Sequence, residues 1–330
     1  MTTNQPSTNT PFSRRDFVHT LATIIPALAA ISAATSQARA AQQTSEPTAK
    51  TETNPSPTKR TLRKAVMIGM VGEGDTLLDK FKLLRDCGFE GAECDSPSSV
   101  PMDEVLEAQE KSGLIVHGLV DSQHWGKPLN HPAEQIREEA IKAMETCIRD
   151  AKKLGSTSIL LVPGIVNNDM PYDECYRLSQ EGIKRVLPVA RECNVKIAVE
   201  NVWNGFLLSP LEAARYVDDF NDPLVTWHFD IGNVINFVRP AQWARILGKR
   251  IVKLHIKDFS LKKRDNEGLW KGFNVELGEG DAGWPDVMKA LDDIGYSTAP
   301  SGNWATAEVR GGDRKRLQQV SEQMDKLFAM

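Results

Sequence analysis

Three carboxylates and one imidazole recur in the second half of the chain, at intervals that suit a divalent-metal site. Glu200, Asp230, His255 and Glu308 stand in the segments AVEN, HFDIGN, KLHIKD and TAEV, 30, 25 and 53 residues apart. An oxygen-rich ligand set without sulfur prefers hard or borderline ions, so Mn²⁺, Mg²⁺ and Co²⁺ fit best and Zn²⁺ also fits. Such an ion can polarise a substrate carbonyl. We therefore predict one divalent metal ion held by these four residues.

The elements that must position these residues alternate between strands and helices. Eight β-rich segments begin at Lys64, Phe89, Leu114, Thr157, Val195, Leu224, Ile251 and Asn303. Segments with helical periodicity lie between them, for example residues 77–89, 138–155, 179–194 and 283–296, and several end at Gly or Asn as helix C-caps do. Eight such units predict a single α/β domain, a (β/α)8 TIM barrel. A doubly wound sheet fits less well, because Gly69, Gly72 and Gly74 lack the spacing of a dinucleotide-binding fingerprint.

Active sites of such barrels lie at the carboxyl ends of the strands. The intervals of 30 and 25 residues each equal about one strand–helix unit, which places Glu200, Asp230 and His255 at similar height on adjacent strands. Taken singly, each acid could be a helix cap or an ion-pair partner, and His255 could be a core histidine. Four such residues in register favour the metal site.

Strand alternation predicts a second layer of side chains around this site. Lys257 and Arg310 follow His255 and Glu308 by two residues and should point the same way, toward the mouth of the barrel. They could contact substrate hydroxyls or an anionic group; the alternative is a structural ion pair with a nearby acid such as Asp258 or Glu279. His228 precedes Asp230 by two residues, which indicates a deeper, supporting position.

Three further residues are candidates for substrate binding. Asn233 lies three residues beyond Asp230, while His124 follows the third strand and Trp203 follows the fifth. Their alternative role is packing at the barrel mouth.

The motifs AVEN, HFDIGN, KLHIKD, LGEGDAGW and TAEV resemble, in this order, those of the xylose isomerase-like sugar phosphate isomerases and epimerases. The likeness is strongest to the L-xylulose/L-ribulose 5-phosphate 3-epimerase branch, often labelled hexulose-6-phosphate isomerase, and extends from Leu62 to Met330. It implies that Glu200, Asp230, His255 and Glu308 bind one divalent metal and that the two glutamates form the acid/base pair. Asn233 stands where some free-ketose epimerases have a histidine, a departure from that group.

The resemblance implies a metal-dependent isomerase or epimerase. Epimerising a ketose removes a proton next to the carbonyl and returns it to the opposite face, through a cis-enediolate whose oxygens the metal holds. The two glutamates would then need different pKa values. A lyase or dehydratase that eliminates from a keto-sugar or keto-glycoside would share the first step. A barrel that only binds sugar is a third reading, which the presence of both Glu200 and Glu308 disfavours.

The N-terminus resembles an export signal. Arg14 and Arg15 precede an apolar stretch and the sequence Ala38-Arg39-Ala40, which predicts a Tat-type signal peptide over residues 1–40, with an uncleaved membrane anchor as the alternative. Residues 41–60, rich in Thr, Ser, Pro, Gln and Glu, predict a disordered linker, and residues 61–330 the catalytic domain. The mature protein would be periplasmic or extracellular and not membrane-bound. Because sugar phosphates are cytoplasmic metabolites, we expect a free or oxidised sugar as substrate.

Composition narrows the classes of partner. The net charge is −4 and basic clusters such as Lys262-Lys263-Arg264 with Lys271 are short, so nucleic-acid binding, including an endonuclease IV-like repair role, is not expected. Five widely spaced cysteines without a CxxC pair predict buried thiols rather than disulfides or a zinc ribbon. The partner we expect is a small-molecule sugar. Relatives in the family are often dimers or tetramers, which leaves a homo-oligomer open.

Overall fold

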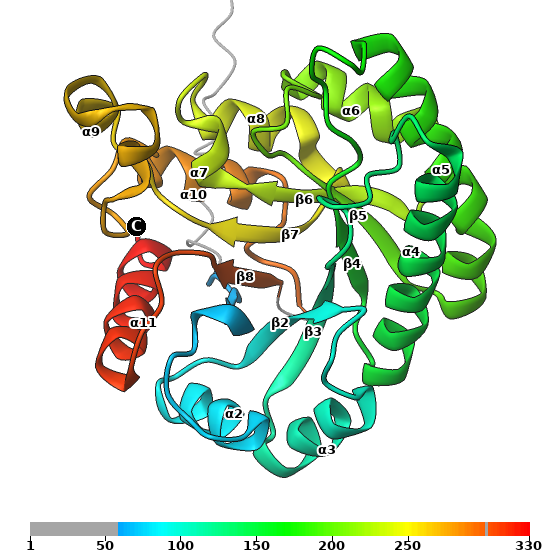
Figure 1. Ribbon diagram of the computed structural model, residues 1–330. Helices are drawn as coiled ribbons and strands as arrows, with labels where there is room; N and C mark the ends of the chain where they lie inside the picture. The colour runs from blue at the N-terminus through cyan, green and yellow to red at the C-terminus, as the bar shows by residue number, and fades with distance from the viewer. Residues whose placement is uncertain (1–58, 301–302) are drawn as a thin grey trace, which may run out of the picture. The chain divides into compact units, whose positions relative to one another are not determined.

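The computed structural model describes residues 59–300 and 303–330. Eight parallel strands close into a barrel in the order β1 to β8, with β8 pairing to β1, and helices surround it (Figure 1). The strands are β1 (Arg63–Met67), β2 (Gly91–Ser96), β3 (Ile115–Asp121), β4 (Ser158–Leu161), β5 (Lys196–Glu200), β6 (Val225–Asp230), β7 (Ile251–Ile256) and β8 (Trp304–Ala307). The predicted TIM barrel is therefore confirmed, and each strand overlaps one predicted β-rich segment.

Helices follow the strands around the outside of the barrel. The α-helices are α2 (Leu77–Asp86), α3 (Met102–Ser112), α4 (Glu134–Leu154), α5 (Tyr172–Cys193), α6 (Pro210–Asp218), α7 (Ile231–Val234), α8 (Pro240–Leu247), α9 (Leu261–Glu267), α10 (Trp284–Asp293) and α11 (Arg314–Phe328). Short 3-10 helices are η2 (Ile68–Met70), η3 (Gly248–Arg250) and η4 (Leu269–Phe273). Helices α3, α4 and α5 end at the left-handed residues Gly113, Gly155 and Asn194, as predicted C-caps.

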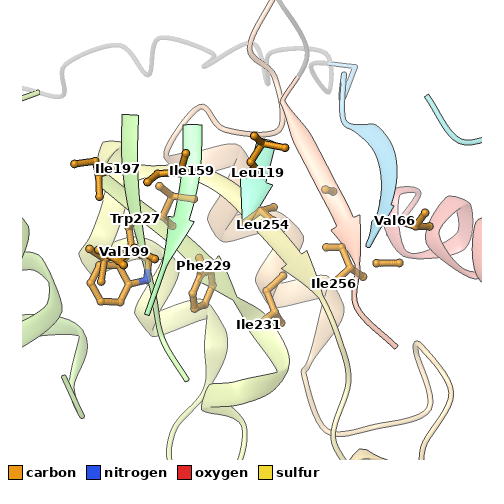
Figure 2. Close-up of a cluster of buried hydrophobic side chains, with 14 of the residues drawn as sticks. Val66, Leu119, Ile159, Ile197, Val199, Trp227, Phe229, Ile231, Leu254 and Ile256 are labelled. Carbon is orange, nitrogen blue, oxygen red and sulfur yellow. The ribbon is translucent and has the colours of Figure 1, made fainter. Parts of the chain in front are cut away.

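The apolar core lies between the strands and the helices. Alternate residues of β5, β6 and β7 form it, among them Val199, Phe229 and Leu254, all fully buried (Figure 2). Phe229 stacks on Trp243 of α8, with the two ring planes 5° apart. The residues between these apolar ones point into the barrel, which is how Glu200, Asp230 and His255 come to share its interior.

The structure also bears on the predictions for the cysteines and for the N-terminal region. All five cysteines are buried and free, as expected. Among the described helices, no stretch combines the length and apolar character that a bilayer crossing requires. The predicted signal peptide and residues 41–58 of the predicted linker lie outside the described residues. Arg60 already belongs to the barrel, since its guanidinium donates to Asp292 at 2.9 Å and to the carbonyl of Phe328 at 2.8 Å.

Candidate metal centre

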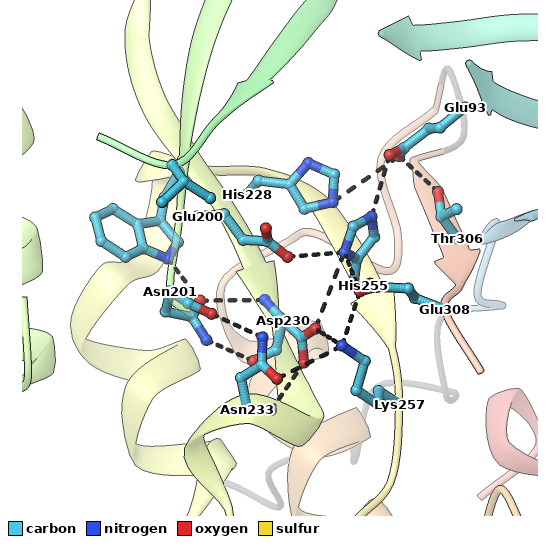
Figure 3. Close-up of polar contacts among 12 residues, drawn as sticks. Glu93, Glu200, Asn201, His228, Asp230, Asn233, His255, Lys257, Thr306 and Glu308 are labelled. Atoms are coloured by element: carbon cyan, nitrogen blue, oxygen red, sulfur yellow. Dashed lines mark hydrogen bonds and ion pairs between the residues drawn. The ribbon is translucent and has the colours of Figure 1, made fainter. Parts of the chain in front are cut away.

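The four predicted metal ligands meet at the carboxyl ends of neighbouring strands. Glu200 and Asp230 are the last residues of β5 and β6, His255 lies near the end of β7, and Glu308 follows β8 directly. Asp230 and His255 are direct partners in the strand register. One donor atom from each of the four residues lies within 4.8 Å of the others (Figure 3). The strands therefore bring together the set that spacing alone predicted.

The imidazole of His255 is the centre of this cluster. Its Nδ1 lies 2.8 Å from Glu200 Oε1, 3.0 Å from Glu308 Oε2 and 3.9 Å from Asp230 Oδ2. Burial disfavours a charge on this ring, but the surrounding carboxylates of Glu308, Glu93 and Glu200 outweigh it and hold the pKa of His255 well above its usual value.

Lys257 adds a cation to the same cluster. Its Nζ lies 2.9 Å from Asp230 Oδ2 and 2.8 Å from Glu308 Oε2. Alternation had placed this side chain correctly. The alternative of an ion pair with a nearby acid also holds, but the partners are Asp230 and Glu308 rather than Asp258 or Glu279. Asp258 instead accepts from the backbone N–H groups of Gly278 and Gly280, at 3.0 and 3.1 Å, and thereby holds the loop before α10.

The two glutamates differ in their ionisation. Burial raises the pKa of Glu200 to about 7, although His255 opposes the shift. Burial acts in the same direction on Glu308, but the charges of Lys257 and His255 outweigh it and lower the pKa of that carboxyl below its usual value. One carboxyl can therefore be protonated near neutral pH while the other is ionised, which an acid/base pair requires.

A divalent cation fits this donor set. Asp230 is fully buried, and within the described residues its Oδ2 is met only by the charged groups of Lys257 and His255, at 2.9 and 3.9 Å. Three carboxylates converge there on one imidazole and one ammonium, and like charges this close repel each other. Carboxylate oxygens with one imidazole suit Mn²⁺, Mg²⁺, Co²⁺ or Zn²⁺. Glu200, Asp230, His255 and Glu308 would hold the ion.

Asp230 is fixed in place by two asparagines. Asn201 accepts from the backbone N–H of Asp230 at 3.1 Å and donates to its carbonyl at 2.7 Å. The backbone N–H of Asn233 donates to Asp230 Oδ1 at 2.8 Å, which caps the short helix α7. These bonds leave Oδ2 as the oxygen that faces the cluster, so the carboxylate is oriented before any ligand binds.

Sequence reasoning missed a buried glutamate behind the metal ligands. Glu93, on β2, is 1% exposed, and its Oε2 lies 3.1 Å from Nε2 of His255. Its Oε1 accepts from the hydroxyl of Thr306 at 2.7 Å, and His228 Nε2 lies 3.9 Å from it. A carboxylate bonded to the far nitrogen of a ligating histidine fixes the ring and its tautomer. The one signal in the sequence was that Glu93 is an acid inside a β-rich segment, FEGAEC, which lies outside the series of spacings that linked the four candidate ligands.

A cavity of about 680 Å³ opens above the cluster. Its walls include four of the five residues predicted to bind substrate, together with both glutamates of the cluster: Asn233, Lys257, Arg310, Trp203, Glu200 and Glu308. His124 is not among the lining residues; it is buried, with Nδ1 3.3 Å from the backbone N of Val162, and its neighbour Trp125 lines the cavity instead.

One side of this cavity is aromatic. The ring of Trp203 lies 4.8 Å from that of Trp270 and 5.0 Å from that of Phe273, measured between centroids. Its indole N–H donates to the carbonyl of Asn233 at 2.8 Å, which fixes the ring beside the metal ligands. Trp270 is 66% exposed and forms the outer part of this wall. A flat apolar surface of this kind suits the C–H face of a sugar ring or a second apolar group.

Comparison with known proteins identifies the family to which the motifs and the fold point. Residues 81–329 match the model of a family described as xylose isomerase-like TIM barrel. An L-ribulose-5-phosphate 3-epimerase of Escherichia coli O1:K1 is 25% identical over 235 residues, which cover 68% of this chain and 80% of the relative.

Solved structures show the same fold at low identity. A 3-keto-D-glucoside 4-epimerase from E. coli superposes with a TM-score of 0.67 at 16% identity, covering 82% of this chain and 100% of that one. A protein named IOLI, crystallised with a bound zinc atom, gives 0.65 at 17% identity, covering 81% and 98%. The family resemblance predicted from the motifs is thus confirmed.

Proposed function

Because the chain belongs to the xylose isomerase-like TIM barrel family, we propose that it is a divalent-metal-dependent sugar epimerase or isomerase. The reaction is proton transfer at the carbon next to a ketose carbonyl. The observation that carries the proposal is the pair of glutamates, Glu200 and Glu308, that meet at one imidazole with pKa values shifted in opposite directions. A protein that only binds sugar has no need of two proton carriers.

The chain's own residues account for the proton movements. A bound divalent ion would supply polarisation of the carbonyl and stabilise the negative charge that develops on its oxygen. The ionised carboxylate of Glu308 can accept the proton at one face of the substrate carbon. Glu200, the carboxyl with the higher proton affinity, can take up a proton during turnover and deliver it at the other face. Lys257, 2.8 Å from Glu308, can donate a hydrogen bond to a substrate oxygen and keep Glu308 ionised.

We propose a sugar without a phosphate group as the substrate. Of the two cations that line the cavity, Lys257 is already paired with Asp230 and Glu308, which leaves Arg310 as the lining cation without a carboxylate contact within the described residues. One wall of the cavity is aromatic and offers few donors, whereas a phosphate is best bound by several. The export signal predicted over residues 1–40 supports the same conclusion, since it would place the mature enzyme in the periplasm or outside the cell.

The first test measures metal content and proton exchange on the full chain, purified after export. We expect one divalent ion per chain, and deuterium from D₂O entering next to the carbonyl of a free ketose or keto-glycoside but not of a ketose phosphate. Exchange that persists in both Glu200→Gln and Glu308→Gln would refute the mechanism. An unsaturated keto product absorbing in the near ultraviolet would identify a lyase instead. A metal-loaded chain that exchanges no proton with any of these sugars would point to binding alone.

A further inference from the structure

A second cavity, of about 550 Å³, lies at the opposite end of the barrel from the candidate metal centre. Its lining comes mainly from the first residues of the strands, since Arg63, Ser158, Lys196, Ile251 and Trp304 begin β1, β4, β5, β7 and β8. The proposed sugar chemistry takes place at the other ends of the same strands. We call this cavity the amino-terminal mouth, and the proposed function makes no use of it.

The charge of the amino-terminal mouth is one-sided. Four basic side chains line it, and none of the lining residues is acidic: the basic residues are Arg63, Lys196, Lys249 and Lys253, of which Lys253 has its pKa lowered to about 7 by burial. Arg63 forms an ion pair at 3.0 Å with Glu90, which is not one of the residues that line the mouth. Within residues 59–300 and 303–330, no carboxylate forms an ion pair with any of the three lysines. Clustered cations without counter-charges repel one another, and an anion would offset that repulsion.

The inner wall of the mouth is rigid. The indole of Trp304 stacks on the imidazole of His117, with centroids 4.4 Å apart and planes 8° apart, and the Arg63 guanidinium lies 3.9 Å from the indole centroid. Gly91 makes room for this indole, because a Cβ there would lie 2.6 Å from a Trp304 ring carbon. Lys253, 3% exposed, donates from Nζ to the carbonyl of His117 at 3.0 Å. The side chains of Arg63 and Lys253 are therefore held in place before any ligand arrives.

A hydroxyl in the wall adds a hydrogen-bond donor to the amino-terminal mouth. Ser158 is 2% exposed and lines the mouth next to Lys196, its direct register partner on β5. Its hydroxyl makes no hydrogen bond to another group in the described part of the chain. A hydroxyl that opens into the mouth beside a lysine can donate a hydrogen bond to an anionic oxygen.

We propose that the amino-terminal mouth binds a small, multiply charged oxyanion, either a phosphate or a sulfate group on a small molecule. Lys196 and Lys249 supply the charged contacts, and the hydroxyl of Ser158 supplies a hydrogen bond. Phosphate and sulfate share the tetrahedral oxygens that such donors recognise. The site is separate from the sugar-binding cavity, so the proposal stands or fails independently of the enzymatic reaction.

The experiment is calorimetric titration of the full chain with inorganic pyrophosphate at low salt, after a chelator has removed divalent metal. Metal removal prevents the anion from binding at the carboxylate cluster. We expect saturable binding at one site. A charged hydrogen bond contributes enough that losing each lysine should weaken binding roughly tenfold. The double variant Lys196→Ala/Lys249→Ala should therefore lose about 100-fold in affinity, and Ser158→Ala should lose several-fold.

The matched control removes two lysines near the other end of the barrel. Lys262→Ala/Lys271→Ala makes the same change in charge on α9 and η4 and should bind pyrophosphate as the unchanged chain does. Three results would each overturn the proposal. They are a loss of affinity in this control, unchanged affinity in the Lys196/Lys249 double variant, and the absence of saturable binding to the unchanged chain. Repeating the titration with sulfate distinguishes the two ligand types, since the natural group should bind more tightly. Thermal unfolding midpoints that match across the variants establish that each is folded.

Discussion

Replacing Glu93 by Gln should weaken metal binding while leaving the barrel folded. In the structure Glu93 Oε2 lies 3.1 Å from His255 Nε2, and this contact directs the other ring nitrogen, Nδ1, toward the three carboxylates. Burial raises the pKa of Glu93, but the imidazoles of His228, His255 and His117 outweigh it and hold that pKa well below its usual value, so the side chain is a carboxylate. Gln keeps the shape and removes the charge.

The structure sets the size of the effect. Removing a carboxylate that orients a ligating histidine typically costs about 10- to 100-fold in metal affinity, or roughly 1.4–2.7 kcal/mol. Gln retains one carbonyl oxygen that can accept from His255, so its loss should be near tenfold. Glu93→Ala removes the acceptor of both His255 and the Thr306 hydroxyl, which lies 2.7 Å from Glu93 Oε1 in the structure. The loss of metal affinity in this variant should therefore approach 100-fold.

The assay is competition for Mn²⁺ between the protein and a chelator of known affinity, run beside thermal unfolding. Glu90→Gln is the matched control, because Glu90 makes an ion pair with Arg63 at 3.0 Å and its side chain is 44% exposed. Exposed pairs contribute little, so Mn²⁺ affinity in this control should stay within about twofold. The reasoning is refuted if folded Glu93→Gln binds Mn²⁺ as tightly as the control does.

Three further predictions test the site and its support. Glu200→Gln and Glu308→Gln should each slow deuterium exchange into substrate about 10²- to 10⁴-fold at saturating metal, and unchanged rates in both would remove the acid/base pair. Mn²⁺ must displace one proton from Glu200 and one from His255. Burial raises the pKa of Glu200 to about 7, and the carboxylates around His255 raise the pKa of that ring well above its usual value despite burial. Chelator competition across pH should thus show affinity rising about two decades per pH unit below pH 7 and about one above; a flat profile would contradict these protonation states. Gly91→Ala places a Cβ 2.6 Å from the Trp304 ring, so urea unfolding should show about 1–3 kcal/mol of lost stability, and no loss would mean that the indole moves aside.

The sequence was sufficient for the eight strands and for the convergence of the four candidate metal ligands, because both follow largely from periodicity. Each strand of a barrel alternates between apolar residues facing the helices and residues facing the interior, and each strand–helix unit has nearly the same length. Counting from Glu200 to Asp230 to His255 therefore gave the correct strand ends. The same alternation placed Lys257 on the interior side, where the structure has it 2.9 Å from Asp230.

Periodicity could not reveal which interior side chains touch across the barrel. Glu93 and His255 are 162 positions apart and meet only because β2 and β7 face each other in the closed barrel. Asp258 seemed available to Lys257 as its neighbour in sequence, but it is engaged by the N–H groups of Gly278 and Gly280. Pairing of this kind depends on side-chain direction in three dimensions, and a single sequence does not encode it in any spacing.

The interior of this barrel explains why the candidate metal centre is rigid. Barrel interiors are commonly filled by branched apolar side chains, whereas here a continuous series of polar contacts runs from Lys253 through His117, Thr306 and Glu93 to His255. Burying such groups is costly unless each has a partner, and every contact in this series is 2.7 to 3.1 Å long. His255 therefore cannot turn without breaking bonds that extend to the opposite end of the barrel. The orientation of the imidazole that faces Glu200 and Glu308 is consequently set by the folding of the barrel itself rather than by the arrival of an ion or a sugar.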